Sequence, residues 1–188
     1  EIGQVVKEMQ FGELERAHKS KADLVTKADL ASEAFLKGKV LESFPDHTIM
    51  AEESGIQQGA PEHQWFIDPL DGTLNYSHGM PIYSISIAYA RDGELQLGVI
   101  YDPSRDELFS AEAGKGAWLN GKPIRVSETR ELIDSMLVTG FRFKDLDTPA
   151  SNFDNFKNVS RYVQAVRRLG SAALDLAIVA CGGLEGFW

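Results

Sequence analysis

The sequence contains one cysteine and no long apolar run, and both absences limit what the protein can be. A single cysteine, Cys181, excludes a fold stapled by disulfides. Because Cys181 lies in an apolar stretch, we expect a buried, inert thiol. No stretch approaches the ~20 apolar residues of a membrane-spanning helix. No secretory signal is visible either, so the cytoplasm is the expected location.

Positive charge and clustered histidines are also scarce. Lysine and arginine number 19 against 28 acidic residues, and the net charge of −9 argues against nucleic acid as the main partner. The four histidines lack metal-ligand spacing and are expected to be non-catalytic: His18, His47, His63 and His78. The 188 residues, 43% of them hydrophobic and 25% charged, are typical of a globular protein with one or two domains.

Two aspartates three positions apart are the most informative feature. Asp68 and Asp71 follow an apolar run that is predicted to be a buried strand, ended by Pro69 and Gly72. Open α/β sheets bind ligands at strand ends, and neighbouring carboxylates repel unless they share a cation. If a helix begins at Thr73, its first amides can face an anion. The pattern therefore predicts the chemistry of a phosphate-ester site.

A second acidic pair follows another short apolar run. Glu52 and Glu53 come after residues 47–50, which are predicted to form a neighbouring strand. Glu52 is therefore a candidate third metal carboxylate. Simpler interpretations stay open, because Asp-Pro and Asp-Gly are common turn pairs, Asp and Thr often cap helices, and a Glu pair is often a solvated corner.

Five segments, in order, resemble the inositol monophosphatase family of magnesium-dependent, lithium-sensitive phosphatases, and its bacterial branch in particular. The segments are residues 23–29, 52–54, 68–75, 114–121 and 168–175. The resemblance implies an α/β fold with stacked α-β-α-β-α layers and mixed and antiparallel sheets. It also implies a homodimer, inhibition by lithium, and a small phosphorylated polyol or sugar as substrate.

The resemblance implies roles for individual residues. The expected activity is hydrolysis of inositol monophosphate or a related sugar phosphate by metal-activated water. Two or three Mg²⁺ ions would be held by Glu52, Asp68, Asp71 and the carbonyl of Leu70. Catalytic roles would belong to Thr73, Asp29 and Glu52, with Thr73 hydrogen-bonded to Asp29. Substrate contacts would come from Gly72, Thr73, Gly170, Ser171 and Ala172.

Other interpretations of these residues stay open. Asp29 and Ser171 are also suited to capping helices, and Arg167 and Arg168 could contact substrate or a partner subunit. Lys19 and Lys21 lie near the position of a family loop lysine, but one residue out of register.

The same residues argue against two rival functions and leave others open. Haloacid-dehalogenase-like phosphatases need two aspartates separated by one residue, whereas two residues separate Asp68 and Asp71, which argues against a phospho-aspartate. An EF-hand pattern is absent. Within the superfamily, fructose 1,6-bisphosphate, histidinol phosphate and nucleotide 3′-phosphates remain alternative substrates. A non-catalytic metal-binding or partner-binding protein with this fold is the alternative from another class.

Periodicity and turn residues predict the following elements. Helices are expected over residues 1–16, 26–43, 151–163 and 171–181, and loops over 19–23 and 57–63. Thr26 and Asp29 form a capping box for the second helix, whose apolar face is expected to use Leu30, Ala31, Ala34, Phe35 and Leu41. An antiparallel meander is expected over 82–126, with turns at 91–94 and 120–121, and strands near 135–139 and 166. Phe141 and Phe143 mark a loop.

Two portions are expected. Residues 1–140 form an N-terminal α+β portion that binds metal and phosphate, and residues 141–188 begin a C-terminal α/β portion. The family continues into a Trp-Asp segment that supplies a further metal ligand, so we expect the protein to extend beyond Trp188. A chain ending there would be a poor catalyst.

Overall fold

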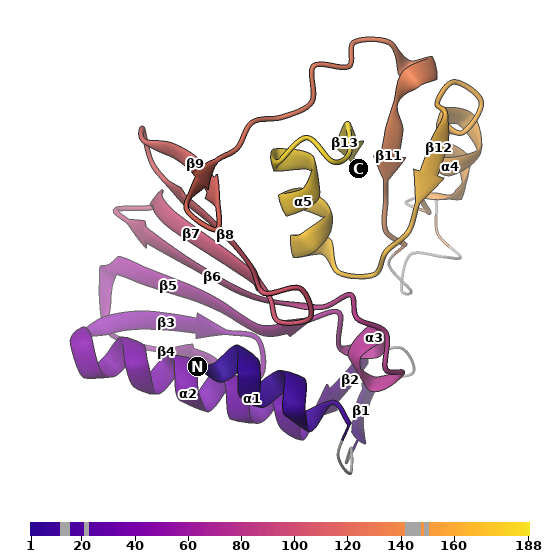
Figure 1. Ribbon diagram of the computed structural model, residues 1–188. Coiled ribbons are helices and arrows are strands. Elements are labelled where there is room, and N and C mark those ends of the chain that lie inside the picture. The colour runs from indigo at the N-terminus through magenta and orange to yellow at the C-terminus, as the bar shows by residue number, and fades with distance from the viewer. Residues whose placement is uncertain (12–15, 21–22, 142–147, 149–150) are drawn as a thin grey trace.

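The computed structural model describes the chain except for residues 12–15, 21–22, 142–147 and 149–150 (Figure 1). Helices α1 (Ile2–Met9) and α2 (Lys27–Ser43) cover one face of an eight-stranded sheet. Helix α5 (Ala172–Ala180) lies on the other side of that sheet, followed by a three-stranded sheet and α4 (Phe153–Val159). This succession confirms the layered α/β fold. No helix among the described residues is long and apolar enough to cross a membrane.

The large sheet has the strand order β10-β9-β8-β7-β6-β5-β3-β4. Its strands are β3 (His47–Ala51), β4 (Gly55–Gln57), β5 (Ala60–Asp71), β6 (Ser84–Arg91), β7 (Glu94–Asp102), β8 (Glu107–Glu112), β9 (Gly116–Leu119) and β10 (Lys122–Pro123). Strands β3 and β5 pair in parallel, and the other neighbours pair antiparallel. The predicted meander is therefore confirmed, and the two acidic segments lie at the ends of adjacent strands, Glu52 just after β3 and Asp68 and Asp71 in the last residues of β5.

The predicted loop over 57–63 is wrong. Gln57 ends β4, and β5 already begins at Ala60. The Thr48 hydroxyl accepts a hydrogen bond from the Gly59 amide (3.0 Å) and donates one to the Ala60 carbonyl (3.2 Å), so β3 draws this polar segment into the sheet. Sheet pairing overrides local composition here.

The two hairpin turns are confirmed. Asp92 and Gly93 connect β6 to β7 with φ values of 53° and 81°, and Asn120 and Gly121 connect β9 to β10 with φ values of 48° and 74°. Positive φ at both central residues defines the turn type whose twist matches antiparallel strands, and Asn, Asp and Gly tolerate it best.

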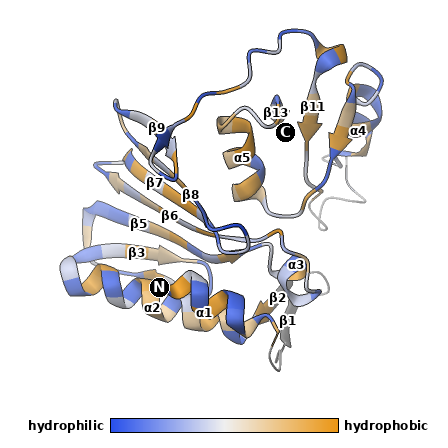
Figure 2. Cartoon of the chain, viewed as in Figure 1, coloured by the Kyte–Doolittle hydropathy of each residue, from blue (hydrophilic) through white to orange (hydrophobic). Residues whose placement is uncertain are grey.

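Helix α2 begins as predicted, but its buried face matches the predicted apolar face only in part. Thr26 and Asp29 form the capping box, with the Thr26 amide 2.8 Å from Asp29 Oδ2. Leu30 and Ala34 are exposed, whereas the buried positions are Ala28, Asp29, Ser32, Glu33, Leu36 and Val40. Figure 2 shows hydrophilic and hydrophobic residues mixed along α2, while α5 is mostly hydrophobic. Of the predicted apolar face, Phe35 and Leu41 do pack against the core. The rest differs because polar residues occupy half of the buried positions.

The first helix is shorter than predicted. Helix α1 ends at Met9, where the Gln10 side chain turns inward and donates to the Tyr76 carbonyl (3.2 Å). Residues from Arg16 form strand β1 (Arg16–Ser20), which pairs with β2 (Asp23–Thr26), so the predicted loop is partly a hairpin strand. Lys19 lies in β1, and Lys21 lies outside the described residues.

The second sheet is parallel and has the order β12-β11-β13. Its strands are β11 (Met136–Val138), β12 (Ala165–Arg167) and β13 (Gly186–Phe187), and a short 3₁₀ turn, Leu132–Asp134, precedes it. Helix α5 is confirmed with Ser171 as its N-cap, whereas α4 is confined to Phe153–Val159 and so is shorter than predicted. The Phe141 ring lies against those of Phe153 and Phe156 in tilted arrangements, and Phe143 lies outside the described residues.

Candidate active site

A bulge in β5 puts the two aspartates on one face of the sheet. Asp68 pairs with Ser86 and Asp71 pairs with Ser84, so three steps on β5 match two steps on β6. Residues two apart on a strand share a face, as do directly opposed residues on neighbouring strands. Asp68 and Asp71 would point to opposite sides of a regular strand, and the extra residue brings them together. Pro69 lies in the bulge rather than ending the strand, because it has no amide to donate.

The carboxylates at this strand end perturb one another. Burial, followed by the negative charges of Glu52 and Asp71, raises the pKa of Asp68 to about 8, and a hydrogen bond with the Glu52 side chain adds to the shift. The parallel ladder runs as far as Glu52, whose amide donates to the Ile67 carbonyl (3.1 Å). A carboxyl group kept protonated by burial and by its acidic neighbours is one that a cation would ionise.

The same residues do not yet converge on one point. In the part of the chain that the structure describes, no group of three or more His, Cys, Asp or Glu side chains is arranged to hold a metal ion. One reason is that Asp71 Oδ2 is turned toward α5. The donor chemistry nevertheless fits Mg²⁺, which prefers carboxylate and carbonyl oxygens, and a shared cation would relieve the repulsion that the Asp68 pKa records.

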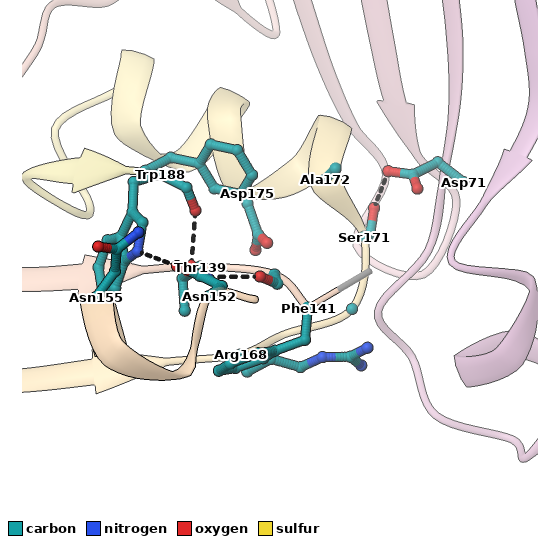
Figure 3. Close-up of a pocket in the computed structure, with 13 residues that line it drawn as sticks. Asp71, Thr139, Phe141, Asn152, Asn155, Arg168, Ser171, Ala172, Asp175 and Trp188 are labelled. Atoms are coloured by element: carbon teal, nitrogen blue, oxygen red, sulfur yellow. Dashed lines mark hydrogen bonds between the residues drawn. The ribbon is translucent and has the colours of Figure 1, made fainter. Parts of the chain in front are cut away.

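Asp71 is anchored by the beginning of α5 (Figure 3). Its Oδ2 atom accepts hydrogen bonds from the Ser171 hydroxyl (2.7 Å) and from the Ala173 amide (2.6 Å). Ser171 is completely buried and also caps α5, with its oxygen 3.4 Å from the Leu174 amide. The positive end of the helix dipole therefore faces the Asp71 carboxylate. This leaves Oδ1 as the atom through which Asp71 could ligate a cation.

Thr73 and Asp29 are in hydrogen-bond contact, as the resemblance implied. Thr73 Oγ1 lies 3.0 Å from Asp29 Oδ1 and 2.9 Å from the Leu70 carbonyl, so its single proton is shared between two acceptors. The other oxygen of Asp29 accepts from the amide (2.8 Å) and hydroxyl (2.5 Å) of Thr26. Asp29 therefore both caps α2 and orients Thr73, and the two interpretations of this residue are compatible.

Gly72 fixes the turn into α3 (Thr73–Ser77). Its φ of 92° lies in the left-handed region, and a Cβ there would come within 2.9 Å of the Ile82 carbonyl oxygen. Only glycine fits both constraints. The Asn75 side chain then donates to the carbonyls of Ile82 and Leu169, both at 2.8 Å, which ties the segment before Gly170 to α3.

A cavity of about 580 Å³ opens beside Asp71 (Figure 3). Gly170, Ser171 and Ala172 line it, so the structure brings three predicted substrate residues next to Asp71. Glu52 and Asp68 line a separate hollow of about 370 Å³. The predicted residues thus form two adjoining groups, joined through the bulge between Asp68 and Asp71.

Sequence reasoning missed Asp175, which also lines the large cavity. Asp175 is 2% exposed, and its Oδ1 has no hydrogen-bond partner among the described residues. Burial and the charge of Asp71 raise the pKa of Asp175 to about 6, against the lowering influence of Arg168. The signal available in the sequence is an acidic residue in the first turn of an otherwise apolar helix, at the end of the fifth resembling segment.

Fold and site together define a mixed α/β protein with acidic residues at the ends of adjacent strands, beside a cavity at the N-terminus of α5. The model of the inositol monophosphatase family matches residues 1–188. The chain therefore belongs to the inositol monophosphatase family.

Its relatives carry two kinds of name. "Nus factor SuhB" from Pasteurella multocida is 44% identical over 177 residues, which cover 94% of this chain and 66% of the relative. "Inositol-1-monophosphatase" from Synechocystis is 46% identical over 168 residues, covering 88% and 58%. The chain thus spans two thirds or less of the length of these relatives.

Solved structures share the fold. Inositol monophosphatase from Anabaena superposes with a TM-score of 0.88 at 46% identity, covering all of this chain and 69% of that one. An IMPase/NADP phosphatase complexed with Mg²⁺ and phosphate superposes with a TM-score of 0.81 at 26% identity, covering 96% and 67%.

Proposed function

We propose that this chain carries the metal and phosphate site of a Mg²⁺-dependent phosphomonoesterase that hydrolyses inositol monophosphate or a related small sugar phosphate. The observation that carries the proposal is the β5 bulge, which aligns Asp68 and Asp71 on one face. Burial and the charges of Glu52 and Asp71 raise the pKa of Asp68 to about 8. An acidic cluster of this kind favours a divalent cation. Family membership supports the same activity.

Glu52, Asp68, Asp71 and the Leu70 carbonyl would hold two or three Mg²⁺ ions. Bound Mg²⁺ would supply positive charge to the phosphate oxygens and lower the pKa of water. The related structure that contains Mg²⁺ and phosphate supports this cofactor. The Leu70 carbonyl already accepts from Thr73, and its second lone pair remains for a cation.

Thr73 and Asp29 would handle the proton of the attacking water. Thr73 shares its own hydrogen between Asp29 and the Leu70 carbonyl, so its oxygen lone pairs can accept a hydrogen bond from water. Because Asp29 is 2% exposed and held by Thr26, it fixes the direction of the Thr73 hydroxyl. The amides of Gly72 and Thr73 would bind the phosphate oxygens.

The polyol or sugar would occupy the cavity beside Asp71, against Gly170, Ser171 and Ala172. The cavity of about 580 Å³ is within the range of small-molecule sites. Its lining includes Arg168, Asp175 and Asn155, groups that can pair with hydroxyls and charges of a small polar ligand. These features support a small phosphate ester over a macromolecular one.

Activity measurements on the natural full-length protein test this proposal. Asp71→Asn keeps size but removes charge, and Mg²⁺-dependent phosphate release should fall on the order of 10²-fold or more. The matched control is Asp92→Asn, at an exposed hairpin turn where asparagine also tolerates positive φ. A screen over inositol phosphate, fructose 1,6-bisphosphate, histidinol phosphate and a nucleotide 3′-phosphate identifies the substrate. Undiminished hydrolysis by Asp71→Asn contradicts the proposal.

A binding role is the second candidate, because several relatives are named Nus factor SuhB rather than phosphatase. In that case the fold would serve partner binding, with or without catalysis. Absence of phosphate release from all four esters, with Mg²⁺ binding retained, would favour it.

A further inference from the structure

The buried face of α2 nearest the site is polar. Asp29, Ser32 and Glu33 are 2%, 0% and 5% exposed, and their spacing of three and four positions places them on one face of the helix. Burying a hydroxyl and two carboxyl groups is costly unless each is hydrogen-bonded. The oxygens of Asp29 accept hydrogen bonds from Thr26 and Thr73, whereas Ser32 and Glu33 bond to the two strand ends.

Glu33 holds the turn that follows β3. Its Oε2 accepts from the Glu53 amide (2.8 Å) and its Oε1 accepts from the Ser54 amide (3.0 Å). The preceding amide, that of Glu52, donates to the Ile67 carbonyl (3.1 Å). Three successive amides are thus fixed, the first by β5 and the next two by Glu33. The Glu52 side chain leaves the backbone between the first two of these amides.

Ser32 makes the corresponding contact with the other strand end. Its hydroxyl donates to the Pro69 carbonyl (2.9 Å), inside the bulge that aligns Asp68 and Asp71. Helix α2 therefore touches both acidic segments through buried side chains one position apart. Neither side chain is a ligand: both Glu33 oxygens already accept backbone amides, and Ser32 donates its proton to the bulge.

We propose that Glu33 is a positioning residue that sets metal affinity by holding Glu52 against Asp68, with Ser32 fixing the opposite side of the pair. The proposal rests on the proposed function, because the direction of Glu52 matters to metal binding only if Glu52 binds metal. The physical reason is preorganisation: an anchored turn spends no free energy on ordering when the cation arrives. Residues that orient metal ligands commonly change affinity ~10–100-fold when mutated.

Direct metal titration of the full-length protein tests the proposal. Mn²⁺ is the probe, and its free concentration is followed by electron paramagnetic resonance. Glu33→Gln keeps the shape but turns one amide-accepting oxygen into a donor, and should raise the Mn²⁺ Kd about 10-fold or more. Lys37→Met is the matched control, because Lys37 also reaches this turn from α2, through Ser54 Oγ (2.7 Å), but at the surface. Its Kd should stay within about twofold.

A second readout separates positioning from mere stabilisation. Excess Mg²⁺ should restore the phosphate-release rate of Glu33→Gln toward that of the unmutated protein, because the ligands remain, whereas it should not restore Glu52→Gln. If Glu33→Gln fails to fold, Glu33→Asp is measured instead. Its shorter carboxylate reaches fewer amides, and it should also bind Mn²⁺ more weakly.

Each outcome decides something. A folded Glu33 variant with the unmutated Kd overturns the positioning role, whether or not the protein is a phosphatase. An unmutated protein that binds Mn²⁺ but releases no phosphate contradicts the proposed function, while the Kd comparison still decides the role of Glu33. An unmutated protein that binds no Mn²⁺ overturns both.

Discussion

Ser171 donates a hydrogen bond to Asp71 across 2.7 Å, joining the end of β5 to the beginning of α5 although 100 positions separate the two residues. The same hydroxyl caps α5 at Leu174. One side chain therefore both starts a helix and orients a candidate ligand.

Replacing Ser171 with alanine should affect stability and metal binding together. Loss of a helix cap costs about 1–2 kcal/mol, and Asp71 Oδ2 keeps only its bond to the Ala173 amide. Urea unfolding and Mn²⁺ titration measure the two effects. Ser160→Ala, which removes an exposed bond at the C-terminal end of α4, is the control and should change neither. An unchanged unfolding midpoint for Ser171→Ala would contradict this account.

Replacing Gly72 with alanine should displace the turn that carries Thr73. The left-handed backbone costs a non-glycine residue about 1–2 kcal/mol, and the new Cβ would lie 2.9 Å from a backbone carbonyl. Gly93→Ala separates the two effects, because Gly93 has a φ of 81° with no atom within 4 Å of its Cβ position. Gly72→Ala should unfold at clearly lower urea than Gly93→Ala. Equal midpoints would show that the close approach at Gly72 is unimportant.

Removing the Thr73 hydroxyl should lower kcat with little change in KM. A positioned proton acceptor raises the catalytic rate about 10²–10⁴-fold, so the kcat of Thr73→Val should fall on that order. Thr73→Ser keeps the hydroxyl and should keep most of the activity. Steady-state kinetics at saturating Mg²⁺ measure this. Thr129→Val, at an exposed threonine, controls for loss of a hydroxyl elsewhere. Full activity in Thr73→Val would mean that water is activated without this residue.

Stability without metal should fall as pH rises. Asp68 has a pKa of about 8 in the folded protein and near 3.8 when unfolded, so the folded state holds an extra proton between about pH 4 and 8. The free energy of unfolding therefore decreases as the pH rises through that window and levels off above it. Asp175, whose pKa is raised to about 6, adds to the decrease in the lower part of the window. Urea midpoints in EDTA measure the slope, which Asp68→Asn should reduce. Added Mg²⁺ should stabilise most above pH 8. A midpoint that rises with pH would be inconsistent with a raised Asp68 pKa.

Lithium should inhibit phosphate release at millimolar concentration. Li⁺ is close to Mg²⁺ in size with half its charge, so it can occupy an oxygen site without supporting turnover. Phosphate release is compared in LiCl and NaCl at equal ionic strength. Identical curves for the two salts would refute the prediction.

Much of the local structure was determined by the sequence alone. Asp92-Gly93 and Asn120-Gly121 demand positive φ, so both hairpins follow from residue identity. Thr26, Asp29 and Ser171 mark the N-termini of two helices, because their side chains are suited to accept hydrogen bonds that the helix itself leaves unmade. The acidic pairs after apolar runs identified both strand ends. These features depend on neighbours within a few positions.

The tertiary structure decided what depends on distant partners. Pro69 was expected to end β5, but pairing with β6 carries the strand on to Asp71, and only the bulge puts Asp68 and Asp71 on one face. Glu33 looks like an ordinary helix-surface acid until the amides after β3 are known to face it. Asp175 becomes buried only because α5 docks beside Asp71. Burial of a polar group is settled by the partner it meets, and sequence periodicity does not encode that partner.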